Sequence, residues 1–230
     1  MPSTTVGTQR LYRVGYDGPD GGGSFRLTLS LAAPERYRVR AVDPVGRALW
    51  SLDVDGEEGL WVDHRAEAAC RLAGSLDLAA GRLTPFPLAS LPALLLGRLP
   101  ASPAGEVEEP GAGEAGEEPE AAAAGDTAGR RLAFADAQGR RWSATLGDDG
   151  APRSWAMTEP GDAAPSVWWR RRGGDGVLSD RVRGIQLTWS QSVVEPLPEA
   201  LAPLAAPPSF HEVPCEVLYA APPADSPSAP

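Results

Sequence analysis

Short runs in which apolar and polar residues alternate recur along this chain, and they restrict its fold more than any other feature. In residues 25–31 a phenylalanine and three leucines occupy every second position, which is the period of a strand with one buried face. Residues 36–42 repeat the pattern, and the turn Asp43-Pro44-Val45-Gly46 follows them. Short strands separated by such turns predict an antiparallel sheet that curls into a sandwich or barrel.

The same signals occur in both halves of the chain. Strands are predicted over residues 9–16, 25–31, 36–42, 47–54, 59–63, 131–135, 141–146, 154–158, 167–172 and 184–189. Between the two sets the period changes, because Leu88, Leu91 and Leu95 have helical spacing, with Pro92 in the first turn and Gly97 as the stop. One short apolar helix is expected there, and residues 198–204 are compatible with a further helical turn.

The 230 residues suit one substantial core. We expect a disordered lead-in over residues 1–9, a single domain over 10–215, and a disordered tail rich in proline and alanine over 216–230. Residues 101–129 hold eight carboxylates, no cation and almost nothing to bury. They are predicted to be a disordered acidic insertion in that domain.

Charge and hydropathy exclude several functions. The formal charge is −10, which argues against nucleic acid as a partner, because phosphate binding needs a basic surface. No apolar run reaches the roughly 18 residues that cross a bilayer, and the N-terminal residues lack the features of an export signal. The chain as given is expected to be soluble and unanchored, and a removed export signal would leave the same appearance.

Candidate catalytic and metal-binding residues are few. His64 follows Asp63, which suits either half of an acid–base pair or a solvated turn, and the turn is favoured; His211 is interpreted as structural. Cys70 and Cys215 lack metal-ligand spacing, and they could pair in an oxidising compartment or remain free thiols. The sequence therefore predicts a protein that is not an enzyme and needs no metal or cofactor.

The run from Trp168 to Arg172 has two interpretations. It could be a patch for a membrane interface or for nucleic acid, or an ordinary strand with Trp168 and Trp169 on opposite faces and arginines at its exposed end. The second is favoured. The leucine-rich helix is similarly open between a plug that fills the end of the barrel and a lid over an apolar cavity.

Two segments resemble the LolA/LolB-like family of lipoprotein carriers. Residues 35–46 are similar to the family segment in which a strand ends in an Asn/Asp-Pro-Leu-Gly turn, and residues 87–100 are similar to its P-L-x-x-L…L-L-G-x-P helix. Residues 25–31 match the preceding strand of the family in place and period, and residues 181–189 resemble a late strand. The likeness covers residues 10–100 and, more loosely, 130–215, and it lies in the order and spacing of these motifs.

The resemblance implies an unclosed antiparallel β-barrel, a half-barrel with a short helical lid across its open side. Its apolar cavity would take lipoprotein acyl chains from a periplasmic carrier and deliver them to the inner leaflet of the outer membrane, without a cofactor or covalent step. Each methylene buried there contributes about 0.8 kcal/mol. The implied protein is a monomer in the periplasm, anchored to the outer membrane.

Applied to this sequence, the resemblance gives two sets of site residues. The expected lipid-binding cavity is lined by the alternating faces and the helix: Phe25, Leu27, Leu29, Tyr37, Val39, Trp50, Leu52, Leu91, Leu94 and Leu95. The expected membrane-insertion loop is Pro44, Val45 and Gly46, with Val45 at the position of an exposed apolar residue. Alternatively, Val45 folds back onto the rim of the barrel.

Three departures from the family pattern are visible: no lipidated cysteine near the N-terminus, no helix before the first strand, and the acidic insertion 101–129. They leave room for two alternatives, a protein-interaction module of the same fold with a filled core, and a carrier of another lipid. A lipid hydrolase is disfavoured, since no Ser/His/Asp arrangement is evident.

Overall fold

A computed structural model describes residues 7–19, 21–73, 90–100, 104, 129–172 and 175–219. Most of the lead-in, almost all of the acidic insertion 101–129, the tail from residue 220, and residues 87–89 of the expected helix lie outside them. The strands are β1 (Thr8–Gly18), β2 (Gly21–Ala33), β3 (Arg36–Val42), β4 (Ala48–Asp55), β5 (Glu58–Asp63), β6 (Ala68–Ala73), β7 (Arg130–Ala135), β8 (Arg141–Leu146), β9 (Pro152–Thr158), β10 (Val167–Arg172), β11 (Asp175–Asp180), β12 (Ile185–Pro196) and β13 (His211–Glu212); the helices are α2 (Leu91–Leu95) and α3 (Cys215–Tyr219).

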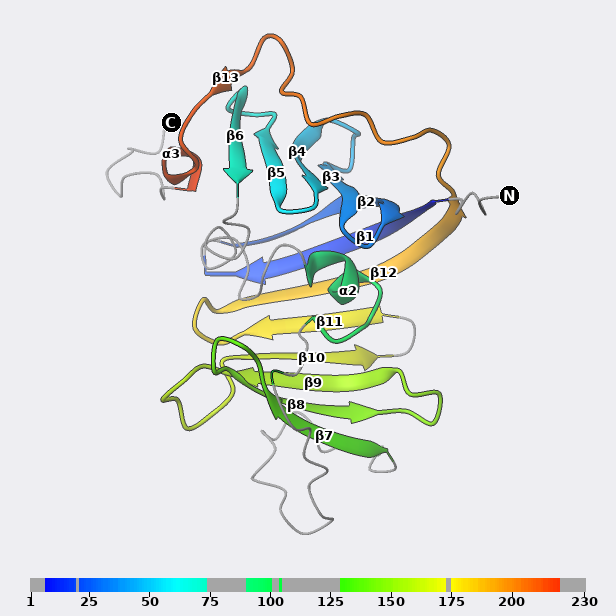
Figure 1. The fold of residues 1–230 in the computed structure, drawn as a ribbon, viewed down its shortest axis with the longest axis vertical. Coiled ribbons are helices and arrows are strands. Elements are labelled where there is room, and N and C mark those ends of the chain that lie inside the picture. The colour runs from blue at the N-terminus through cyan, green and yellow to red at the C-terminus, as the bar shows by residue number, and fades with distance from the viewer. Residues whose placement is uncertain are drawn as a thin grey trace. The chain divides into compact units, whose positions relative to one another are not determined.

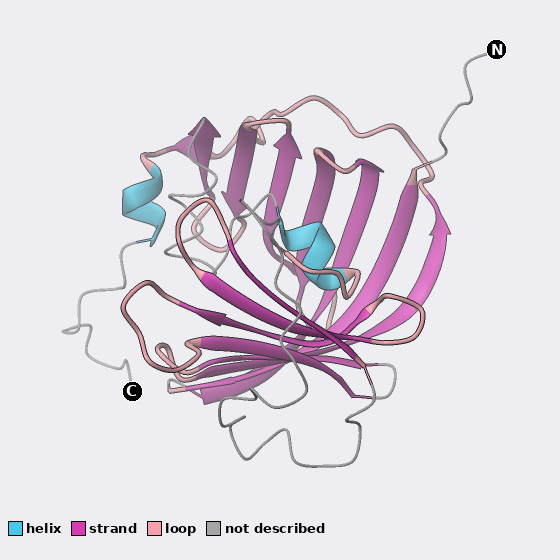
Figure 2. Ribbon diagram, turned by 60° about the horizontal axis from the view of Figure 1, so that its bottom comes forward, coloured by secondary structure: helices cyan, strands magenta, loops and turns pink. Residues whose placement is uncertain are grey.

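The strands form one unclosed sheet, which confirms the predicted fold class. Its order is β13-β6-β5-β4-β3-β2-β1-β12-β11-β10-β9-β8-β7, so β13 and β7 are its two end strands. Consecutive strands pair antiparallel from β2 through β6 and again from β7 through β12, whereas β13 pairs with β6 in parallel. Figures 1 and 2 show how strongly strands dominate the described chain.

The chain divides into two compact units, which are described separately. Unit 1 comprises Met1–Arg13, Phe25–Pro92 and Ser192–Pro230, and unit 2 comprises Val14–Ser24 and Ala93–Gln191. The expectation of a single domain over residues 10–215 stays a prediction. The helix α3 begins at Cys215, so it includes the first residues of the expected tail.

In unit 1 the antiparallel meander β2–β6 buries the face that alternation predicted. Leu29 lies opposite Val39, which lies opposite Leu52, and all three side chains have no exposed area. Paired residues of antiparallel strands share a face, so this row forms the centre of the core. The other face carries arginines and aspartates in matched positions, as in the ion pair of Arg38 with Asp53.

The C-terminal segment of unit 1 crosses the other face of β5 and β6 and is fastened to β6. Leu204, Ala206 and Phe210 pack on Leu60, Val62 and Ala69. The disulfide between Cys70 and Cys215 then joins α3 to β6, which settles the alternatives left open for the two cysteines in favour of pairing.

The helical turn considered for residues 198–204 is not formed. The segment runs without regular secondary structure, and the Arg36 guanidinium donates to the carbonyl of Leu201 over 3.0 Å. Pro198 and Pro203 remove two backbone donors from this stretch, so a helical turn has little to gain there. The strand before it, β12, extends seven residues beyond its predicted end at residue 189, and Ser192 donates to the carbonyl of Leu11 on β1.

Candidate functional site

The predicted cavity residues on strands share one face of unit 1. Leu27, Leu29, Tyr37, Val39 and Leu52 are buried, whereas Phe25 and Trp50 are half-buried. Burial raises the pKa of the Tyr37 phenol well above its ordinary value, because the charged form loses its hydration. The structure thus brings together seven of the ten predicted residues on a strongly apolar surface. Their role as a lipid-binding cavity stays a prediction.

Three half-buried aromatic rings occupy one end of this face. Trp50 and Trp61 are stacked with centroids 4.8 Å apart, and Phe25 meets the edge of Trp50 at 6.5 Å. Leu52 pairs with Trp61 across β4 and β5, which places Trp61 on the same face. Unlike the buried aliphatic row beside them, these rings retain exposed area, so they are the part of the face that a ligand can reach.

The turn between β3 and β4 is held rigidly by Asp43. One oxygen of its buried carboxylate accepts the backbone N–H groups of Val45 at 3.0 Å and Arg47 at 2.9 Å, and the other accepts Arg47 Nε at 2.6 Å. Burial would raise the pKa of Asp43, but the hydrogen bonds and the charge of Arg47 outweigh burial and lower it. Gly46 closes the turn with φ of 94°.

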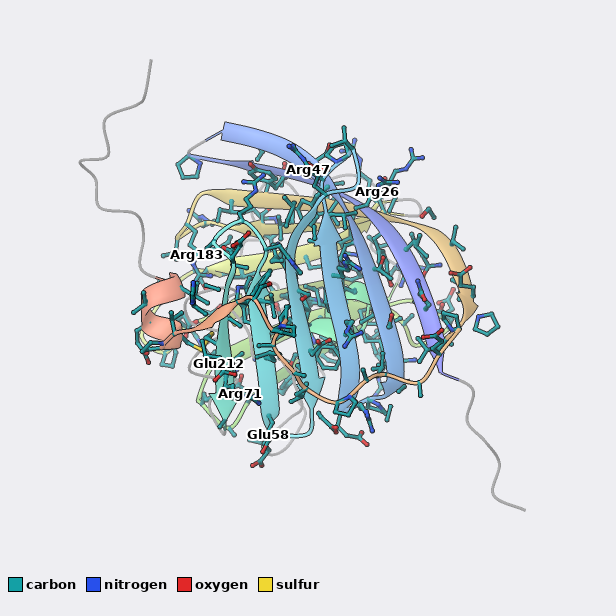
Figure 3. The ribbon with its side chains drawn as sticks, turned by 90° about the horizontal axis from the view of Figure 1, so that it is seen from above. Arg26, Arg47, Glu58, Arg71, Arg183 and Glu212 are labelled. Carbon is teal, nitrogen blue, oxygen red and sulfur yellow. A yellow bond between two sulfur atoms is a disulfide. The ribbon has the colours of Figure 1, made fainter. Side chains whose placement is uncertain are left out.

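Val45 stands at the apex of this turn with 78% of its surface exposed, so it does not fold back onto the sheet. Arg26 donates to the carbonyl of Pro44 over 3.2 Å, and the Arg47 side chain is 80% exposed. Both arginines lie beside the turn in Figure 3. An exposed valine on a rigid tip between two cations suits contact with an anionic, apolar interface.

Unit 2 buries a second apolar face, which is rich in tryptophan. Along the paired strands β7 to β10, ring centroids follow one another at 6.3 Å from Phe134 to Trp142, 5.3 Å to Trp155 and 6.2 Å to Trp169. Trp142, Trp155 and Trp169 are at most 2% exposed. This row fills the inner surface of the strands and rigidifies it.

Trp189 lies flat over Gly176, its direct partner on β11. A methyl group at Gly176 would approach the Trp189 ring to 2.5 Å. We expect Gly176→Ala to lower the free energy of unfolding by about 2 kcal/mol, because the ring must leave its packed position. Urea denaturation measures the change. Gly15→Ala is the matched control: Gly15 also neighbours β12, yet a methyl group there has 4.0 Å to its nearest atom. Equal stability of the two variants would contradict the proposed packing.

Within the described residues, the helix α2 comprises Leu91–Leu95. Gly97 follows it with φ of 68°, as predicted for the residue that ends the helix. Leu91 is half-buried and belongs to unit 1, whereas Leu94 and Leu95 are buried in unit 2. Within unit 2, Gly97 lies close to Trp169, at 3.7 Å from the position of an added methyl group. The role of this helix as a lid stays a prediction.

The remaining polar candidates have structural roles. The carboxylate of Asp63 accepts the backbone N–H groups of Arg65 and Ala66 at 2.8 and 3.0 Å, which confirms the interpretation as a turn. The ring of His64 meets Phe210 edge-on at 5.5 Å, and its pKa is lowered by burial and by the charge of Arg40. Within the described residues, no group of three or more His, Cys, Asp or Glu side chains could hold a metal ion, and no helix has the length and apolarity to cross a membrane.

Trp168 and Trp169 lie on opposite faces of β10, as the favoured interpretation predicted. Trp169 pairs with Trp155 and Leu178 and is buried, whereas Trp168 pairs with Ala156 and Ser179 and is half-buried. Two depressions of about 430 Å³ each occur in unit 2. Arg170 and Arg172 line one of them, Trp168 lines the other, and neither is lined by a predicted cavity residue.

Sequence reasoning missed Trp61 and the tryptophan row of unit 2 as parts of the apolar faces. Trp61 lies in the run Leu60-Trp61-Val62, in which both faces of the strand are apolar. Alternation therefore does not show which face of the sheet Trp61 occupies. Trp142 and Trp155 stand alone in short strands, so only the pairing register reveals that their rings are neighbours.

No family model matches the chain, and no curated protein matches it significantly. Solved structures do match. A LolA superfamily protein from Nitrosomonas europaea is 12% identical with a TM-score of 0.53, over 88% of this chain and 89% of that one. An outer membrane lipoprotein-sorting protein domain from Vibrio parahaemolyticus is 6% identical with a TM-score of 0.55, over 86% and 88%. The unclosed sheet of this chain therefore has the fold of the LolA superfamily.

Proposed function

We propose that this chain binds the acyl chains of lipoproteins on the apolar face of unit 1 and delivers them to the outer membrane, as a non-enzymatic, LolB-like receptor. It would receive its cargo from a periplasmic lipoprotein carrier. The disulfide supports an oxidising compartment such as the periplasm. We further propose that the chain acts there as a monomer at the inner leaflet of the outer membrane.

The rigid, exposed Val45 turn is the observation that carries the proposal. It lies at the end of β3 and β4 where Phe25 and Trp50 leave the apolar face half-open, since Trp50 pairs with Ala41 immediately before the turn. An acyl chain on these rings would therefore sit close to the residue that meets the membrane. Transfer then needs no chemistry, only an apolar environment that is larger than the protein's own.

A second candidate function is a protein-interaction module with a filled core. The absence of any exposed area at Leu29, Val39 and Leu52 favours it, because a vacant cavity would expose its lining to solvent. A carrier of another lipid is the third candidate and differs only in its cargo.

Uptake of a fatty acid separates these functions. A fluorescent fatty acid should bind with one-to-one stoichiometry, and a dibrominated fatty acid should quench tryptophan fluorescence through contact with Trp50 and Trp61. The double variant Trp50→Phe/Trp61→Phe should still take up the fatty acid, because phenylalanine keeps the surface apolar, but it should lose most of the quenching. Trp168→Phe, on the exposed side of β10, should keep the quenching. Absence of uptake would rule out acyl-chain binding and leave the filled-core module and the carrier of another lipid.

Val45→Glu should slow delivery of a bound fatty acid to liposomes roughly tenfold, because a carboxylate at the tip opposes entry into the bilayer. Uptake should stay unchanged, since the side chain points into solvent. Stopped-flow transfer to vesicles that carry an acceptor fluorophore measures the rate. Gln138→Glu is the matched control at the apex of the β7–β8 turn, which Asp136 holds in the same way. Loss of uptake in Val45→Glu would instead assign Val45 to the cavity.

A further inference from the structure

The turn between β11 and β12, within unit 2, is also held by a buried aspartate, but with a different spacing: Asp180 bonds to the residue three positions ahead, whereas Asp43 bonds to the residues two and four ahead. Asp180 is buried, and its carboxylate accepts the backbone N–H of Arg183 at 3.0 Å and the Arg183 guanidinium at 3.2 Å. Gly184 closes the turn with φ of 65°, and the N–H of Arg181 donates to the carbonyl of Ser166 over 2.9 Å. These bonds fix the backbone on both sides of the apex.

The apex residue is Val182, with 78% of its surface exposed. Val45 has the same exposed fraction, and both exceed the other exposed large apolar residues of the described chain. The turn at Asp136–Arg140, which has the same hydrogen bonds as the Val45 turn, has the polar Gln138 at its apex. A turn held by a buried aspartate therefore does not require valine at its apex.

The surroundings of Val182 favour a phospholipid surface as its partner. The apex is flanked by Arg181, which is exposed, and by Arg183, which neutralises the carboxylate of Asp180. Long arginine side chains can lie along an apolar surface and place their charge among phosphates. Inserting this tip would thus place no bare carboxylate of its own in the headgroups.

A depression of about 430 Å³ adjoins the turn. It is lined by the following residues of unit 2: Asp17, Gly18, Pro19, Trp168, Ser179, Asp180, Arg181, Gly184, Ile185 and Gln186. Pro19 of the β1–β2 turn lies against Gly184, at 3.9 Å from the position of an added methyl group. The half-buried ring of Trp168 supplies a side chain of the kind that concentrates at bilayer interfaces. Arg181 and Asp17 offer both charges to a zwitterionic headgroup.

We propose that the β11–β12 turn is a second bilayer-contacting tip, in which Val182 enters the apolar edge of the membrane and the adjoining depression receives a phospholipid headgroup. The inference extends the membrane role proposed for Val45, and it does not depend on acyl-chain binding.

Flotation of the empty protein with vesicles of phosphatidylethanolamine and phosphatidylglycerol tests this proposal. Val182→Glu should weaken vesicle binding roughly tenfold, and Val182→Leu should strengthen it about fourfold, the gain expected for one more inserted methylene. Both variants are also made in the Val45→Glu background, where the first tip no longer contributes. Their midpoints of thermal unfolding should match the parent protein, because the side chain has few contacts to lose.

Gln138→Glu and Gln138→Leu are the matched controls and should alter binding little. The proposal is overturned if the Val182 variants bind vesicles like these controls in both backgrounds, and capture of a protein partner by Val182 would then be the function left for the tip. Failure of fatty-acid uptake removes the carrier function but leaves this test intact, because vesicle binding is measured without cargo.

Discussion

Cys215→Ser should lower the free energy of unfolding by about 3–5 kcal/mol, one of the two largest effects that the structure predicts. The disulfide joins residues 145 positions apart, and closing so long a loop removes much of the entropy of the unfolded chain. The serine variant leaves Cys70 as a fully buried thiol, which a core tolerates well. Urea denaturation under oxidising conditions measures the difference.

The loss of stability in Cys215→Ser should be largest around β6 and β13 in unit 1. Without the bond, α3 is no longer fastened to β6, and the two-residue pairing of β13 with β6 and the exposed ion pair of Arg71 with Glu212 offer little to replace it. Hydrogen exchange should rise in β6 and β13 before it rises in β3. The wild-type protein treated with a reductant is the control and should match Cys215→Ser. Equal stability of the oxidised wild type and the variant would show that the bond does not constrain the chain.

The disulfide also illustrates how far the sequence alone could lead. Alternation predicted the β2–β5 meander and its buried face, because the two-residue period of a strand can be recognised from consecutive residues. The pairing of Cys70 with Cys215 depends on the C-terminal segment crossing β5 and β6, which is a long-range packing event with no local pattern. Its apolar contacts, such as that of Phe210 with the cluster of Leu60, Val62 and Ala69, come from a segment that shows no strand or helix period in sequence.

Two of the three strands that were missed, β6 and β11, have a related cause. The strand β6, Ala68–Ala73, consists of small and apolar residues apart from Arg71, and β11 has five consecutive buried residues, Gly176–Asp180. A strand that is buried on both faces shows no alternation of apolar and polar residues. The sequence of such a segment therefore shows neither which face each side chain occupies nor whether the segment pairs as a strand. The same holds for the candidate site, where Phe25 and Trp50 were predicted from their period and Trp61 was not.

The turn at Asp43, in contrast, was predicted from the sequence. A second turn held in the same way, at Asp136, gives the second of the two largest expected effects on stability. The turn of Asp136 and Arg140 has the same hydrogen bonds as the turn of Asp43 and Arg47, but its ion pair is buried: the Asp136 and Arg140 side chains are 7% and 13% exposed. Asp136 also accepts Trp142 Nε1 at 2.9 Å. Burial alone would raise the pKa of Asp136, but the hydrogen bonds from Trp142, Arg140 and the turn backbone outweigh it and lower the pKa.

Asp136→Asn should therefore lower the free energy of unfolding by about 3 kcal/mol at neutral pH, since it leaves the Arg140 charge buried without its partner. Because the pKa of Asp136 is lower in the folded state than in the unfolded state, its stabilising contribution is complete above the unfolded value near 4 and is lost as the pH falls through the folded value. Urea denaturation from pH 7 to pH 3 should show the wild type and the variant converging at the acid end. Asp43→Asn is the control with a solvent-exposed arginine and should lose less; a constant difference across the range would mean that the Asp136 carboxylate is not the stabilising group.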